Sequence, residues 1–311
     1  MPKRATREAF GATLIELADE GLDVVAVEAD LSKSTTTATF AARYPDHFFN
    51  VGIAEQNMVG TAAGLAVAGK VAFTGSFAVF ATGRAYDQVR NTVCYSELNV
   101  KLAPTHSGIT VGPDGGSHQM IEDLALMRVL PGMRVLVPAD YRAAQAALRI
   151  AATTPGPFYV RLGRAALQDV YDGSASFELG RAYTVREGSD VTLFACGVMV
   201  GEALLAADLL AEEGVSAEVV DIMTLKPLDV ATVVSSACKT GAVVACEEHS
   251  IIGGLGSAIA EVLGEQHPTP FARVGVRDVF GTSGDPAALM EYFGLTARHV
   301  AAAARGVIAR A

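Results

Sequence analysis

Two patterns of hydrophobic residues alternate along the chain: a helical repeat and a short, nearly continuous apolar run. In residues 6–20 the apolar side chains of Phe10, Leu14 and Leu17 recur on one helical face, which predicts an amphipathic helix. Residues 22–29 follow as a nearly continuous apolar run, the pattern of a parallel strand that is buried on both faces. This succession indicates an α/β protein.

The same two patterns repeat over the rest of the chain. Strands are predicted at 48–52, 71–74, 100–105, 133–137, 158–162, 191–196, 217–220, 242–246 and 271–276. Helices are predicted at 38–44, from 55 onward, and at 77–95, 120–130, 141–152, 203–213, 258–264, 286–293 and 296–308. Alternating strands and helices imply right-handed crossovers and parallel sheets. We therefore expect an α/β fold of two domains, each a mostly parallel sheet flanked by helices.

A stretch without clear periodicity separates the two blocks. We predict a first domain over residues 1–165, a linker over 166–180 and a second domain over 181–311. A chain of 311 residues has room for about two domains.

Composition and charge argue against several classes of protein. The net charge of -10 argues against a general nucleic-acid or anionic-membrane surface. The basic N-terminus has no apolar segment behind it, so no signal peptide is predicted. The cysteines show no CxxC spacing and are Cys94, Cys196, Cys238 and Cys246. These features favour a soluble protein of the reducing cytoplasm.

Polar residues and glycines gather in four loops that follow predicted strands, at 30–34, 52–55, 76–80 and 106–118. Ligands of parallel α/β sheets bind at the carboxyl ends of the strands. Glu55 falls in the first turn of its predicted helix, where the helix dipole favours a carboxylate. On its own this glutamate could equally be a helix cap.

The fourth loop contains His106, Asp114, His118 and four glycines. A flexible surface loop is one interpretation. A metal site is disfavoured because the two histidines are far apart in sequence and no cysteine accompanies them. The other interpretation is acid–base and hydrogen-bonding chemistry at neutral pH.

These stretches resemble the transketolase family of thiamine-diphosphate enzymes. Gly52-Ile53-Ala54-Glu55 matches the family pattern G-x-x-E, and the loop from His106 to Gln119 matches H-(x)7-D-G-x-x-H-Q. The resemblance implies that Glu55 binds and shares a proton with the aminopyrimidine ring of the cofactor. It also implies that His118 and Asp114 contact the donor substrate, and that His106 reaches its phosphate.

The resemblance extends to other loops and implies roles for further residues. Phe80 would stack on the aminopyrimidine, Phe77 would line the same pocket, and Asp30 and Leu31 would lie near the cofactor rings. The residues that match the family's phosphate contacts are Arg7, Ser34 and Arg164. Taken singly, each phenylalanine could be ordinary core and each arginine a solvated charge.

One part of the family pattern is missing. The chain has no G-D-G motif, which in the family precedes an asparagine and holds Mg²⁺ and the diphosphate. The resemblance therefore implies a split enzyme: this chain supplies the pyrimidine-binding and C-terminal domains and holds no metal ligand. A partner subunit supplies the diphosphate and Mg²⁺ site. Because active sites of the family form across a dimer interface, the resemblance implies an α2β2 heterotetramer. Asn57 also departs from the histidine found in many transketolases.

The second half contains three stretches that need no catalytic role. Gly253-Gly254-Leu255-Gly256 resembles the start of a dinucleotide fingerprint, but Ile259 stands where the third glycine should be. Stretches similar to Glu247-Glu248-His249 and to residues 280–284 are structural and interfacial in the family. We expect the same here.

The resemblance implies transfer of a two-carbon ketol unit from a ketose or its phosphate to an aldose phosphate. Two alternatives use the same cofactor: 1-deoxyxylulose-5-phosphate synthase, which has Arg at the His106 position, and the β subunit of a 2-oxo acid dehydrogenase. The alternative of another class is a non-catalytic regulatory subunit, which would have no need of Glu55, Phe80, Asp114 and His118 together.

Overall fold

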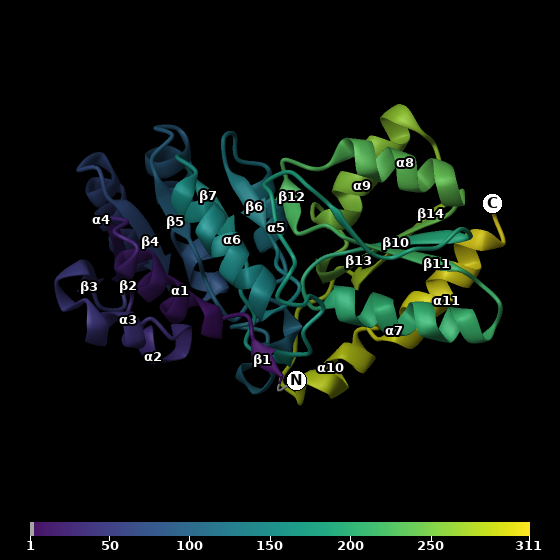
Figure 1. Ribbon diagram of the computed structural model, residues 1–311. Helices are drawn as coiled ribbons and strands as arrows, with labels where there is room; N and C mark the ends of the chain where they lie inside the picture. Colours follow the sequence, from purple (N-terminus) through teal and green to yellow (C-terminus); the bar gives the residue numbers. More distant parts are fainter. Residues whose placement is uncertain (1–2) are drawn as a thin grey trace.

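The computed structural model describes residues 3–311, so the first two residues of the predicted first domain lie outside the description. Figure 1 shows two sheets side by side, each covered by helices, with the N-terminus near the boundary and the C-terminus at the far end. The predicted fold class is therefore confirmed. The domain limits at 165 and 180 stay a prediction.

The larger sheet of the described chain has seven strands in the order β12-β6-β7-β5-β4-β2-β3. Its strands are β2 (Val24–Glu28), β3 (Phe48–Asn50), β4 (Val71–Gly75), β5 (Val100–Leu102), β6 (Arg134–Leu136), β7 (Phe158–Val160) and β12 (Thr224–Lys226). All pairs are parallel except β12 with β6. The strand β12 comes from the second half of the chain and forms one edge of the sheet of the first half (Figure 1).

The second sheet, over the same described residues, has five strands in the order β14-β13-β10-β11-β9. They are β9 (Tyr183–Arg186), β10 (Val191–Ala195), β11 (Ala217–Asp221), β13 (Val243–Ser250) and β14 (Phe271–Val276). Only β9 runs antiparallel. A short antiparallel ribbon joins β1 (Arg4–Ala5) to β8 (Ala166–Leu167).

Helices cover both faces of each sheet. In the first half they are α1 (Glu8–Asp19), α2 (Ser32–Thr35), α3 (Ala38–Arg43), η1 (Pro45–His47), α4 (Glu55–Val67), η2 (Val79–Arg84), η3 (Gln88–Cys94), η4 (Ile109–Asp114), α5 (Asp123–Arg128) and α6 (Tyr141–Thr153). In the second half they are α7 (Met199–Glu212), α8 (Val230–Thr240), α9 (Leu255–Gln266), α10 (Pro286–Tyr292) and α11 (Ala297–Ile308).

Strand β2 shows how the apolar runs build this architecture. All five of its residues are buried, because successive side chains point to opposite faces and both faces are covered. Val24 and Ala26 join the core beneath α1 and α6. Val25 and Val27 join a second core that also contains Phe194 and Ile222 of the other half. One apolar core thus continues from one sheet to the other.

Several predicted elements are wrong in their limits. Residues 77–95 do not form one regular helix: η2 and η3 are wide turns, with bonds such as Ala85 N to Phe80 O at 3.3 Å and Tyr95 N to Arg90 O at 3.0 Å. Wide turns of this kind are frequent at functional sites. The helix predicted at 120–130 begins only at Asp123, since Met120 bridges to Ser107.

Other elements were not predicted. The helix α8 was missed, whereas α7 was predicted but begins at Met199 rather than at 203. The antiparallel strands β9 and β12 were also missed, since each is short and stands at a sheet edge.

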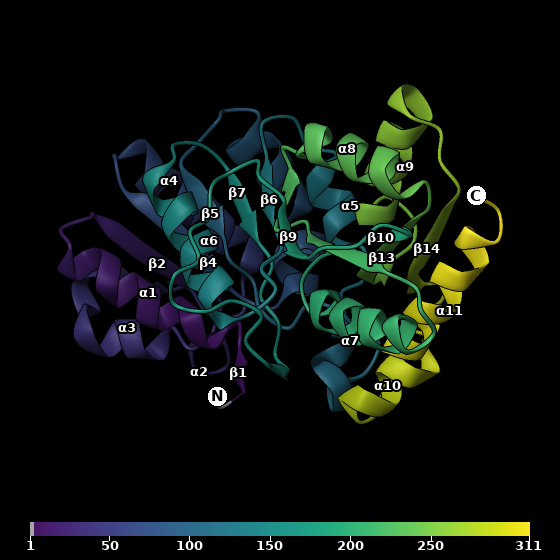
Figure 2. The same ribbon diagram turned by 45° about the vertical axis from the view of Figure 1, so that its right-hand side comes forward.

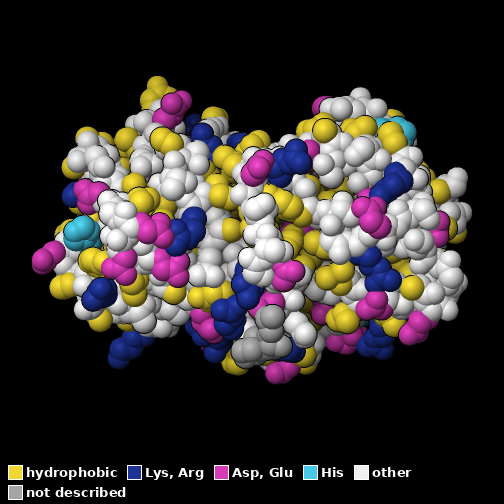
Figure 3. Space-filling view, in the orientation of Figure 1, with side chains coloured by type: hydrophobic (Ala, Val, Ile, Leu, Met, Phe, Trp, Pro, Cys, Tyr) yellow, Lys and Arg dark blue, Asp and Glu magenta, His cyan; other side chains and the backbone are white. Residues whose placement is uncertain are grey.

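Charged side chains of both signs are spread over the surface. On the face shown in Figure 3, basic and acidic side chains are interspersed, with no continuous field of Lys and Arg. Within residues 3–311, no helix has both the length and the apolar character that crossing a membrane requires.

A buried ion pair lies where the two halves meet. Arg161, just after β7, donates from Nε to Oδ2 of Asp123 at 2.7 Å and from Nη2 to Oδ1 at 3.2 Å. Its Nη2 also donates to the main-chain oxygen of Glu248 on β13 at 3.0 Å. Burial alone would raise the pKa of Asp123, but Arg161 and His249 hold it below its usual value.

We predict that Arg161→Met lowers the free energy of unfolding by about 3–5 kcal/mol, because Asp123 is left buried without its cation. Chemical denaturation of the two proteins measures the difference. The control is Arg298→Met, which removes an exposed ion pair to Glu291 and should cost much less, because exposed ion pairs contribute little to stability. Equal losses in both variants would contradict the prediction.

Candidate functional site

The four polar loops meet at one edge of the seven-stranded sheet. Strands β2, β3, β4 and β5 are parallel neighbours, so their carboxyl ends lie together. The sequence predicted this edge correctly.

Glu55 is the first residue of α4 and is only 2% exposed. Arg84, at the end of η2, donates from Nη1 to Oε2 of Glu55 at 2.8 Å. The guanidinium carbon of Arg84 lies 4.5 Å from the centre of the Phe80 ring, within the range of a cation–π contact. One arginine therefore orients both residues predicted to bind the aminopyrimidine. Sequence reasoning missed Arg84, which is 29 residues from Glu55.

Aromatic rings connect Glu55 to the histidine loop. The rings of Phe77 and Phe80 lie 6.1 Å apart and nearly parallel. Phe77 stacks on the His106 imidazole at 3.8 Å, and Phe80 meets the ring of His118 edge-on at 5.4 Å. Phe77 is nearly buried, whereas Phe80 is half-buried. The four rings form a wall along the sheet edge.

His106 is held neutral by its surroundings. Its Nδ1 lies 2.7 Å from Oγ1 of Thr105, and its Nε2 lies 3.4 Å from Nη1 of Arg7. An arginine can only donate, so Nε2 accepts and Nδ1 bears the proton. Burial, followed by the nearby charges of Arg7 and Arg164, lowers the pKa of His106 to about 3.

Arg7 and Arg164 form a cationic end of the site. Arg7 donates to the main-chain oxygen of Ser34 at 3.0 Å, and Arg164 lies 3.5 Å from Oδ1 of Asp114. Burial and then the like charge of Arg164 lower the pKa of Arg7. Two neighbouring arginines are suited to a dianionic group such as phosphate.

Asp30 and Leu31 lie at the same edge of the sheet. Within the described residues, neither forms a hydrogen bond to the aromatic rings or to Glu55. Asp30 exchanges bonds with Asn50, from its main-chain N to Oδ1 at 3.1 Å and from Nδ2 of Asn50 to its own Oδ1 at 3.2 Å. The main-chain oxygen of Leu31 accepts from Ser34 N at the start of α2. Asn50 was not predicted.

Beneath this loop lies a buried carboxylate that the sequence did not reveal. Glu28 accepts from the hydroxyl groups of Thr35 and Thr37 at 2.5 and 2.6 Å. Burial raises its pKa to about 7. A β carbon on Gly75 would lie 1.9 Å from the Glu28 carboxylate, so this glycine gives the carboxylate its space.

The arrangement suits a ligand with a ring at one end and an anionic group at the other. Among the described residues, the ion pair with Arg84 uses Oε2 of Glu55, so Oε1 can accept a hydrogen bond from a ring N–H. Over residues 3–311, no group of three or more His, Cys, Asp or Glu side chains is arranged to hold a metal ion. The geometry thus defines an α/β protein whose candidate site, at the carboxyl ends of its strands, suits a cyclic, anionic ligand.

Comparison with known proteins identifies the family. Residues 2–169 match the family model "Transketolase, pyrimidine binding domain", and residues 180–300 match "Transketolase, C-terminal domain". The chain belongs to the transketolase family, as predicted.

Similar proteins cover nearly the whole chain. A "Putative transketolase C-terminal section" from Methanocaldococcus jannaschii is 46% identical, over 96% of this chain and 94% of that protein. A "6-deoxy-6-sulfo-D-fructose transketolase subunit" from a Clostridium species is also 46% identical, over 98% and 94%. A solved structure titled "Split gene transketolase, inactive beta4 tetramer" has 52% identity and a TM-score of 0.91, covering 99% of both chains.

We predict that the His106 imidazole does not titrate between pH 5 and pH 8. Its folded pKa of about 3 lies below the unfolded value, so acid protonates the unfolded chain first. The stability that this neutral ring contributes is therefore lost as the pH falls from about 6.5 toward 3. Proton–carbon NMR of the ring measures the titration, with His106→Gln to assign the signal. A midpoint near 6.5 would contradict the prediction.

Proposed function

We propose that the chain is the C-terminal subunit of a split, thiamine-diphosphate-dependent transketolase. It transfers a two-carbon ketol unit from a ketose or ketose phosphate to an aldose phosphate. The observation that carries the proposal is the placement of Glu55, Phe80, His118 and His106 along one sheet edge. The names of the similar proteins support it.

The residues present fit the aminopyrimidine half of the cofactor. Glu55 would share a proton with a nitrogen of the ring, Phe80 and Phe77 would provide the apolar face, and Asp30 and Leu31 would lie at the rim. Thiamine diphosphate, when bound, supplies the thiazolium carbon that stabilises negative charge on the reacting carbon of the substrate. The protein contributes orientation and the exclusion of water.

The loop residues bind the sugars. His118 contacts the carbonyl or hydroxyl region of the donor, and Asp114 accepts from the neighbouring hydroxyl. The phosphate end is bound by His106, Arg7, Ser34 and Arg164. Because His106 is neutral, the positive charge at this end comes from Arg7 and Arg164.

The diphosphate and its Mg²⁺ are held by a partner, the N-terminal transketolase subunit, which contains the G-D-G motif. The exposed face of α4, with Gly60 and Gly64, allows close approach of another backbone. We propose an α2β2 heterotetramer in the cytoplasm. A similar protein is described as an inactive tetramer of β chains, which supports the need for the second subunit.

The alternatives fit the site less well. A 1-deoxyxylulose-5-phosphate synthase has Arg where His106 stacks on Phe77. The β subunit of a 2-oxo acid dehydrogenase lacks the Asp114 to Gln119 arrangement and has no use for two arginines at a phosphate end. A regulatory subunit would not require a buried Glu55 oriented by Arg84.

We predict that the chain, purified from its native host with thiamine diphosphate and Mg²⁺, retains a stoichiometric partner that contains G-D-G. The pair should transfer two-carbon units from a ketose to an aldose phosphate, and the isolated chain should not. Mass spectrometry identifies the partner, and a coupled assay measures transfer. Decarboxylation of a 2-oxo acid, dependence on pyruvate, or no turnover would each support a different alternative and refute this function.

We further predict that Glu55→Gln lowers turnover of the assembled enzyme by about 10²- to 10⁴-fold, the usual range for a lost acid–base group. The free energy of unfolding should change little, because glutamine keeps the shape of the side chain. Steady-state kinetics and denaturation measure both effects. The control is Glu212→Gln, an exposed residue of α7, which should leave turnover unchanged. Retained activity in the Glu55 variant would refute the assignment.

A further inference from the structure

The sequence of the loop that contains Asp114 and His118 does not by itself determine the conformation of the loop. Gly108, Gly112 and Gly115 have φ angles of 77°, 81° and 78°, in the region that glycine adopts freely. A glycine-rich segment has many alternative paths and loses much entropy when it is fixed. Yet residues 107–112 are buried, so groups outside the loop must select this path.

One such group is Glu248, on strand β13 of the second half. Its Oε1 accepts a hydrogen bond from the main-chain N of Thr110 at 2.6 Å. A β carbon on Gly108 would lie 2.2 Å from the carboxyl carbon of Glu248, so the carboxylate fills the space next to this glycine. Arg161 holds the main-chain oxygen of Glu248 at 3.0 Å. Arg161 therefore fixes the main chain of Glu248, and the carboxylate of Glu248 binds the loop.

A second contact comes from residues 281–286. The side-chain Nε2 of Gln119 donates to the main-chain oxygens of Thr282 at 2.9 Å and of Ile109 at 3.1 Å. A β carbon on Gly116 would lie 2.4 Å from the main-chain oxygen of Gly281. Helix α10, which follows this segment, packs against η4 (Figure 2). The second half thus contacts the loop at both its beginning and its end.

We propose that the second half of the chain sets the conformation of the substrate loop, with Glu248 as the positioning residue for Asp114 and His118. Glu248 does not touch the substrate. It acts through Thr110 and Gly108, four residues or more before Asp114. The substrate role of the loop rests on the proposed function, whereas the contacts that fix it do not.

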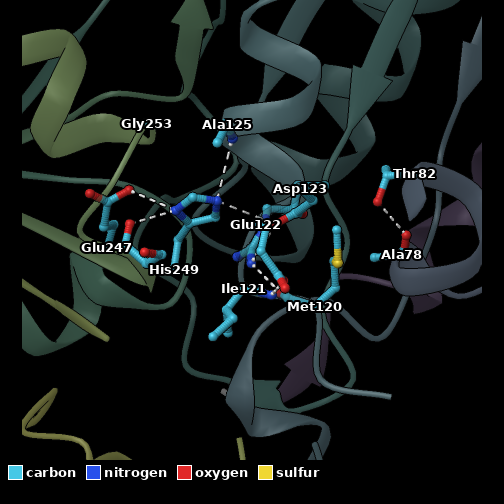
Figure 4. A network of polar contacts seen from close by, with 12 residues as sticks. Ala78, Thr82, Met120, Ile121, Glu122, Asp123, Ala125, Glu247, His249 and Gly253 are labelled. Atoms are coloured by element: carbon cyan, nitrogen blue, oxygen red, sulfur yellow. Dashed lines mark hydrogen bonds and ion pairs between the residues drawn. The ribbon is translucent and has the colours of Figure 1, made fainter. Parts of the chain in front are cut away.

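The neighbouring Glu247 provides a matched control. It lies on the same strand and is also buried, and its carboxylate accepts from the main-chain N of Leu255 at 2.7 Å and of Gly256 at 2.8 Å. Figure 4 shows its carboxylate beside His249, whose Nδ1 is 3.6 Å from Oε2. Both glutamates thus bind backbone N–H groups, but Glu247 binds those of α9 and Glu248 binds the loop.

The first test measures hydrogen–deuterium exchange of residues 106–119 in the full chain. In Glu248→Ala the amide of Thr110 loses its acceptor, and exchange over the loop should rise by about tenfold or more. Glu247→Ala should leave it unchanged. Glu248→Gln should restore slow exchange, because the glutamine oxygen can still accept from Thr110. Unchanged exchange in Glu248→Ala, or an equal rise in both alanine variants, would overturn the proposal.

The second test measures kinetics of the enzyme assembled with its partner subunit. Glu248→Ala should raise the KM of the sugar substrates about tenfold or more, and calorimetry should find the Kd of thiamine diphosphate within about twofold of that of the unmodified protein. Faster loop exchange with unchanged KM would overturn the positioning role. Absence of transketolase turnover in the unmodified enzyme would refute the proposed function, and the exchange experiment would still decide whether Glu248 fixes the loop.

A second variant covers the case in which Glu248→Ala fails to fold. Gly281 is half-buried, and a β carbon there would lie 1.8 Å from Oε1 of Gln119. Gly281→Ala should therefore displace Gln119 and speed loop exchange. The control is Gly306→Ala on α11, where an added β carbon meets nothing within 4 Å. Equal exchange in the two glycine variants would contradict the role of this segment.

Discussion

The bidentate pair between Arg161 and Asp123 is the contact on which the relation of the two sheets depends. A buried arginine is tolerated only when its charge is matched and its remaining N–H groups are bonded. Here Asp123 supplies the charge, and Nη2 also donates to the main-chain oxygens of Met120 and Glu248. Strand β7, helix α5, the end of the substrate loop and strand β13 therefore meet at a single guanidinium.

The site at the sheet edge is electrostatically divided. At one end a buried carboxylate, Glu55, faces the guanidinium of Arg84. At the other end lie Arg7 and Arg164, and the nearby imidazole of His106 stays neutral because burial, and then the charges of the two arginines, lower its pKa. Rings of phenylalanine separate the two ends. This polarity suits a ligand that is a hydrogen-bond donor at its ring and an anion at its far end.

Local patterns predicted much of the fold and the edge where the site lies. Strand β2 was evident from its apolar run, and Glu55 and His106 were placed at one edge because strands end there. The helix α8 was missed because five of its eleven residues are the β-branched Val and Thr, and strand β12 because three residues are too few to show a period. The contacts of Arg84 with Glu55 and of Glu248 with Thr110 join residues that are 29 and 138 positions apart in the chain. Such contacts become visible only when the packing of the helices and strands is known. The roles assigned to the site residues stay predictions.

The strand β12 has a consequence for how the molecule unfolds. It belongs to the second half of the chain by sequence but pairs with β6 in the sheet of the first half, and one apolar core runs through both. Opening either half would expose an unpaired strand edge and part of the core of the other. The two halves are therefore coupled into one cooperative unit, and a cut in the segment that joins them would leave the pieces associated.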